Sequence, residues 1–105
     1  MRICHITSVH ARNDARIFKR QCVTLANSGF EVILVCCDGN KDEIVDEVKI
    51  TSYSKSRLSK KERFSFLYRN KNFISYLLSI NADIYQFHDI ELIEVGRKLA
   101  KVKKV

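Results

Sequence analysis

Short apolar runs alternate with longer amphipathic segments along this chain. Residues 2–7 and 30–37 are rich in β-branched and other apolar side chains, and the second segment is apolar at every position from residue 32 on. Such continuous runs are typical of strands that are covered on both faces of a sheet. Between the two runs, apolar side chains recur within residues 18–26 at the spacing of one helical face. The pattern predicts a strand, a helix and a second strand.

Residues with strong end preferences mark the limits of these elements. Asn13 or Asp14 is a good N-cap for the first helix, and Gly29 can take the left-handed conformation just past its last turn. Residues 43–53 alternate weakly between apolar and polar, which predicts one or two short strands. The later elements expected are a helix over 61–80 that ends at Asn81, a strand over 83–88 and a helix from 91 to about 102.

The order of these elements predicts an α/β fold. Strands that alternate with helices form parallel βαβ units, so we expect a doubly wound parallel sheet of about four strands and three helices. The expected strand order is roughly 3-2-1-4. At 105 residues the chain is about one small domain. Ligands in such folds bind at the carboxyl ends of the strands, which points to residues 8–14 and 88–91.

Composition narrows the class of protein. Hydrophobic residues make up 46% and charged residues 30%, as expected for a globular domain. The longest unbroken apolar run, residues 32–37, is far too short to span a membrane, and the N-terminus lacks the apolar segment of a signal peptide. The four cysteines lie within apolar runs. They are expected to be reduced thiols that pack as small hydrophobes in a cytoplasmic protein.

The net charge of +7 is concentrated in two places. Residues 55–71 hold seven basic side chains and one acid, and a second basic cluster ends the chain. Such patches attract an anionic membrane, a phosphorylated ligand or nucleic acid, although for either patch alone a solvated helix flank is the simpler interpretation. Nucleic acid is disfavoured, because the nearby aromatic residues fit the core face of the predicted helix over 61–80. The residues of the candidate membrane-contact patch are Lys55, Arg57, Lys60, Lys61 and Arg63.

The loop after the first strand leads into a helix N-terminus, where free N–H groups favour an anion. His10, Arg12 and Arg16 would add hydrogen-bond donors or positive charge there. The loop contains no glycine, so it is neither a dinucleotide-binding fingerprint nor a P-loop. Asp14 is expected to cap the helix rather than to act as a base.

The loop after the last strand begins at His88. A histidine at a strand end can donate, accept or shuttle a proton near neutral pH, or it can cap the next helix. Asp89 is an N-cap candidate, and Glu91 suits the first turn of the following helix. The histidines and cysteines have no metal-ligand spacing, so we predict no metal site.

The whole chain resembles the N-terminal part of a bacterial glycosyltransferase of the GT-B, family-4-like type. The resemblance rests mainly on H-x-x-x-D-x-R-I-F at residues 10–18 and on F-H-D-x-E-L at residues 87–92. The two motifs are fairly specific together, and each alone would be weak. The chain departs from the family pattern at Ala11 and Ile90, where proline is common, and at Gln86, where histidine is common.

The resemblance implies an enzyme with two Rossmann-like domains and an active site in the cleft between them. Residues 1–105 would be a truncated acceptor-side domain, and the donor-binding C-terminal domain would be absent from this chain. The implied reaction is retaining transfer of a sugar from a nucleotide-sugar donor to a saccharide or lipid-linked acceptor in cell-surface polysaccharide synthesis, without a metal or other cofactor. We expect the isolated chain to be inactive.

The resemblance also implies roles for single residues. His88 would reach the transferred sugar or the acceptor, as the catalytic residue. The substrate-binding set would be His10, Arg12, Asp14, Arg16, Asp89 and Glu91. The basic patch would dock the protein peripherally on the inner face of the membrane. The alternative is a free-standing flavodoxin-like module that binds phosphate or a nucleotide.

Overall fold

The structure is a computed structural model that describes residues 1–7, 11–53, 71–88, 96–97 and 99–100. Its elements are the strands β1 (Arg2–Ile6), β2 (Glu31–Cys36), β3 (Glu43–Val45), β4 (Val48–Ser52) and β5 (Ile84–Phe87), and the helices η1 (Ala15–Val23), α1 (Thr24–Asn27) and α3 (Lys71–Ile80). Helix η1 is wound as a π-helix and continues directly into α1. The protein therefore has the α/β class that its sequence predicts.

The five strands form one sheet in the order β3-β4-β2-β1-β5. Strand β1 pairs in parallel with both β2 and β5, and β2 pairs in parallel with β4. These four strands have the predicted order. The expectation of a parallel sheet of about four strands is wrong in one respect, because β3 adds a fifth strand that is antiparallel to β4.

A two-residue turn explains the extra strand. Asp46 and Glu47 link β3 to β4, and both have positive φ angles, 49° and 68°. This backbone conformation is the one that two-residue hairpins favour, with Asn or Asp common at the first position and Gly at the second. Asp46 suits the first position, but Glu47 stands where glycine is usual, so the weak alternation of residues 43–53 is the main sign in the sequence of two short strands.

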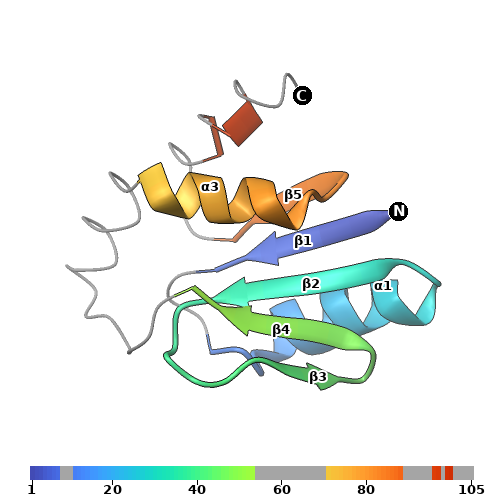
Figure 1. Cartoon of the computed structure of the whole chain (residues 1–105). Helices are drawn as coiled ribbons and strands as arrows, with labels where there is room; N and C mark the ends of the chain where they lie inside the picture. Colours follow the sequence, from blue (N-terminus) through green and yellow to red (C-terminus); the bar gives the residue numbers. More distant parts are fainter. Residues whose placement is uncertain (8–10, 54–70, 89–95, 98, 101–105) are drawn as a thin grey trace.

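Helices cover both faces of the sheet, with α3 on one side and α1 on the other (Figure 1). On the first side Phe73 and Leu77 of α3 are fully buried against Cys4 and Ile6 of β1. On the second side the buried residues are Ile17, Phe18, Cys22, Ala26, Val32, Leu34, Cys36, Val48 and Ile50. Coverage on both faces is the reason why β2 is apolar along most of its length.

The helix limits predicted from the sequence are confirmed where the structure describes them. Gly29 has φ +95° just after α1, and its N–H donates to the carbonyl oxygen of Ala26 at 3.1 Å. Asn81 ends α3 with φ 53°. The first part of the helix expected over 61–80 lies outside the described residues, and α3 is its second part.

The helix expected from residue 91 is described at only four positions, 96, 97, 99 and 100, all of them helical. Leu99 is buried in the α3-side core. Gly96 lies against Phe87, where an added Cβ would meet the ring carbon Cε2 at 3.1 Å. These contacts pack the helix against β5. No helix in the described part of the chain is long and apolar enough to cross a membrane.

Candidate functional site

The carboxyl ends of β1, β2 and β5 meet at one edge of the sheet. The backbone N–H of His88 donates to the carbonyl oxygen of Ile6 at 3.1 Å, so the ladder between β5 and β1 extends one residue past β5. On the other side of β1, the N–H of Thr7 donates to the carbonyl oxygen of Val35 at 2.9 Å. Residues 7 and 88, about eighty positions apart in the chain, therefore leave the sheet side by side.

Two histidines are in contact at this edge. Nδ1 of His5, in β1, lies 2.8 Å from Nε2 of His88, within hydrogen-bond distance. The two rings are nearly parallel, with an interplanar angle of 15° and centroids 5.1 Å apart. His88 is partly exposed, whereas His5 is fully buried. The pair thus joins the interior of the sheet to its carboxyl edge.

Burial sets the protonation state of the inner ring. Removal from water, and secondarily the charge on His88, lower the pKa of His5 to about 4. His5 is therefore neutral at physiological pH. Within the part of the chain that the structure describes, its Nε2 has no hydrogen-bond partner. A buried polar atom in that state is uncommon and calls for a physical explanation.

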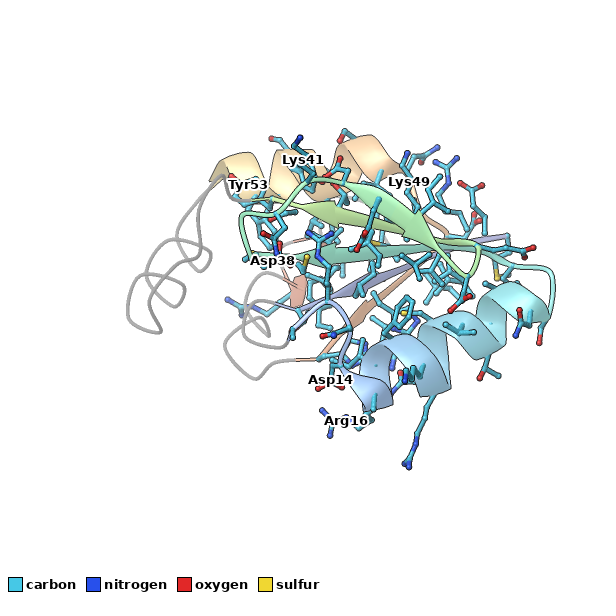
Figure 2. The ribbon with its side chains drawn as sticks, turned by 90° about the horizontal axis from the view of Figure 1, so that it is seen from below. Asp14, Arg16, Asp38, Lys41, Lys49 and Tyr53 are labelled. Atoms are coloured by element: carbon cyan, nitrogen blue, oxygen red, sulfur yellow. The ribbon has the colours of Figure 1, made fainter. Side chains whose placement is uncertain are left out.

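Asp14 caps η1, as the sequence predicts. Its Oδ1 accepts hydrogen bonds from the backbone N–H groups of Arg16 and Ile17, both at 3.0 Å. This carboxylate is occupied at the first turn of the helix, where N–H groups otherwise lack partners. Figure 2 shows Asp14 at the start of η1 and Arg16 on the outer side of that helix. The side chain of Arg16 is exposed.

Arg12 already has protein partners for each of its guanidinium nitrogens. Nε and Nη2 donate to the two carboxylate oxygens of Asp38 at 2.6 and 2.8 Å, and Nη1 donates to the Lys41 carbonyl oxygen and to Glu43. The guanidinium holds the pKa of Asp38 well below its usual range. Arg12 thus ties the segment after β1 to the segment after β2, and its charge is not available as an independent anion site.

Sequence reasoning missed two residues of this edge, His5 and Asp38. Asp38 follows the apolar run of β2 just as Arg12 follows β1, so their proximity at adjacent strand ends could have been anticipated. His5 lies between apolar neighbours and resembles a core position. The one available indication was its place one residue before the carboxyl end of β1. Several predicted residues lie outside the described part of the chain, namely His10, Asp89, Glu91, Lys55, Arg57, Lys60, Lys61 and Arg63.

Metal binding has no support in the residues that the structure describes, since no three His, Cys, Asp or Glu side chains among them gather around a common point. A cavity of about 260 Å³ lies beside α3, on the other face of the sheet from the histidine pair. Its polar lining residues are Arg2, Glu31, Asp42, Lys49, Thr51, Tyr76 and Ser79. The hydroxyls of Thr51 and Tyr76 share a hydrogen bond of 2.7 Å in its wall.

Comparison with known proteins finds no relative of this chain. No protein-family model matches the chain, and neither the curated proteins nor the solved structures include a significant match.

Proposed function

We propose that this chain is the acceptor-side domain of a retaining GT-B glycosyltransferase that transfers a sugar from a nucleotide-sugar to a saccharide or lipid-linked acceptor. One observation is the main support. The strands that lead into the two motifs of the resemblance, β1 and β5, are adjacent and parallel, so their carboxyl ends lie side by side. The motif at residues 10–18 follows β1, and the motif at residues 87–92 includes the end of β5.

The strand order supports the finer Rossmann-like assignment. From β1 the chain adds β2 and then β4 on one side, and it later returns to place β5 on the other side of β1. The order reverses between β1 and β5. In open α/β sheets, ligands bind in the crevice at the carboxyl ends of the strands where such a reversal occurs. The His5–His88 pair lies at this position, and β3 is an antiparallel addition at the far edge.

In this proposal His88 contacts the transferred sugar or the acceptor. The capped start of η1 and the Arg12–Asp38 pair hold the neighbouring segments in place. A second domain supplies the donor site, and the basic residues between 55 and 63 dock the enzyme on the inner face of an anionic membrane.

The geometry disfavours the alternative of a phosphate-binding module. A phosphate at the start of η1 would need the free N–H groups of the first turn. Two of these groups are bonded to the Asp14 carboxylate, whose negative charge would also repel the ligand.

The test uses the native protein of the source cells, captured with an antibody against this chain. We expect a band of roughly 350–400 residues, the size of about two domains, which releases nucleotide from at least one nucleotide-sugar when membrane lipid extract is added. His88→Ala at the chromosomal locus should lower the release by on the order of 100-fold. Lys19→Ala, an exposed change on η1, is the matched control and should leave it unchanged.

Two outcomes would overturn the proposal. One is a captured protein that releases no nucleotide from any nucleotide-sugar of a broad panel. The other is full activity in the His88→Ala strain. Tight nucleotide binding by a native protein of 105 residues, without transfer, would favour the binding-module alternative instead.

A further inference from the structure

His5 is a polar residue in a place that suits an apolar one. It is fully buried in the middle of the sheet, between Cys4 and Ile6, which are also fully buried. Its Nε2 has no partner among the described residues, and its only polar contact there is Nδ1 with His88. Burying a polar atom without a partner costs stability. Natural proteins retain such costs mainly at functional sites.

We propose that His5 is a positioning residue for His88: it engages Nε2 of the His88 ring and fixes the ring in the tautomer that carries its proton on Nδ1. The tautomer depends only on contacts within this chain. Its importance for sugar transfer rests on the proposed function.

The hydrogen bond itself restricts the outer ring. Because Nε2 of His88 faces His5 at 2.8 Å, every further hydrogen bond of the His88 ring has to be made through Nδ1. The nearly parallel rings also fix the plane of the imidazole at the sheet edge. A histidine at the end of a short strand would otherwise be able to rotate about χ2, where its torsional preference is broad.

The choice of tautomer follows from the unpartnered atom. If His88 donated from Nε2, neutral His5 would accept at Nδ1 and would bury an N–H at Nε2 without an acceptor. If His5 donates from Nδ1, the buried Nε2 holds a lone pair instead. Orphaned buried N–H groups are the rarer of the two in proteins, so the second arrangement is favoured. His88 then carries its proton on Nδ1 and acts as a donor in its neutral form.

The pair also resists a second proton. Two imidazolium rings with nitrogens 2.8 Å apart would repel each other strongly, and the lowered pKa of His5 has the same cause in part. With the inner ring neutral, the outer ring has a constant partner across the physiological range. His5 therefore acts on His88 through orientation and proton placement and does not itself reach the substrate.

The experiment measures the tautomers of both rings by long-range ¹H–¹⁵N correlation NMR on the 105-residue chain at pH 7.5. In the wild type we expect protonated Nδ1 and unprotonated Nε2 on both rings. His5→Leu, which replaces the ring by an apolar side chain of similar volume, should shift His88 to a mixture of tautomers. His5→Asn, whose amide can donate from near the position of Nδ1, should restore the single tautomer.

Gln21→Ala is the matched control. It removes the 3.2 Å hydrogen bond between Gln21 and Gln86, which joins η1 to β5 without involving either histidine. The His88 tautomer should not change in this variant. A wild-type spectrum with the His5 proton on Nε2, or an unchanged His88 tautomer in a folded His5→Leu chain, overturns the proposal. If His5→Leu does not fold, the wild-type and His5→Asn spectra decide: a His5 proton on Nε2 in the wild type, or a mixture of His88 tautomers in His5→Asn, overturns the proposal.

The same variants in the native enzyme separate this proposal from the proposed function. His5→Leu should lower kcat by on the order of 10- to 100-fold with little change in KM, and His5→Asn should recover most of the loss. Full activity in His5→Leu would overturn the positioning role and leave the transferase assignment intact. Absence of any transferase activity in the wild type, with the predicted tautomers present, would overturn the function and leave the tautomer assignment intact.

Discussion

Arg12 holds Asp38 by two hydrogen bonds of 2.6 and 2.8 Å, and both side chains are largely buried, at 12% and 19% exposure. This planar two-point contact joins the segments that follow β1 and β2. It is stronger than a typical surface ion pair, because partial burial limits the screening by water.

Breaking this pair should therefore cost stability. Arg12→Ala leaves the Asp38 carboxylate partly buried without its main partner, and we expect a loss of about 1–3 kcal/mol in the free energy of unfolding by urea denaturation. Lys19→Ala, which removes an exposed positive charge from η1, is the control and should change stability by less than about 0.5 kcal/mol. Equal effects of the two substitutions would show that the pair contributes nothing.

The N-cap of η1 gives a second prediction. Asp14→Ala removes the acceptor of two backbone N–H groups and should lower stability by about 1 kcal/mol. Asp14→Ser keeps a capping oxygen and should therefore retain most of the stability that Asp14→Ala loses. Thermal unfolding of the three proteins at one pH measures both effects. If Asp14→Ala were as stable as the wild type, the N–H groups of the first turn of η1 would have to find acceptors other than Asp14.

The His5 ring predicts a specific dependence of stability on pH. Its pKa is about 4 in the folded chain and 6.5 in an unperturbed histidine, so the unfolded state binds more protons between these values. Stability due to this group is complete above about pH 6.5 and is lost as the pH falls toward 4, by at most about 3 kcal/mol. His88 is the neighbouring titratable group that adds to the shift.

The comparison that isolates this effect is the wild type against His5→Leu, unfolded in urea at several pH values between 4 and 7.5. The difference in stability between the two should move in favour of His5→Leu as the pH is lowered. Parallel curves over the whole range would contradict the burial of a neutral His5.

The wall of the cavity beside α3 supplies a fourth prediction. The hydroxyls of Thr51 and Tyr76 are 2.7 Å apart, and burial raises the pKa of the Tyr76 phenol. Tyr76→Phe should cost about 1 kcal/mol, and Thr51→Val a similar amount. In the double variant the two costs should not add, because both groups of the bond are then removed together. Additive costs would show that the two hydroxyls are not coupled.

Several parts of this fold could be predicted from local sequence alone. The apolar run of β2, the cap at Asp14 and the stop at Gly29 each depend on a physical preference that acts over a few residues. The β3–β4 hairpin is only weakly indicated, because Glu47 stands at the position of its turn where glycine is usual.

The candidate site was harder to predict, because its contacts join distant segments. His88 could be singled out by its place after a strand, and the predicted strand order already put that strand beside the first one. Which side chain of β1 meets His88 depends on the register and on side-chain packing. Arg12 is a similar case. The sequence suggests a free positive charge there, but Arg12 is bonded to Asp38, which follows the neighbouring strand. The order of the strands follows from the order of the elements, whereas the side-chain contacts between them are decided by tertiary packing and leave little trace in either segment.

All four cysteines are buried, so the reactivity of their thiols reports when the core opens. Cys4 and Cys37 lie in the core beneath α3, whereas Cys22 and Cys36 lie in the core beneath η1 and α1. Burial raises the pKa of Cys4, Cys22 and Cys36 to about 12, so these thiols hardly react while the core is closed. Pulsed alkylation followed by peptide mass spectrometry would therefore show which helical layer separates from the sheet first.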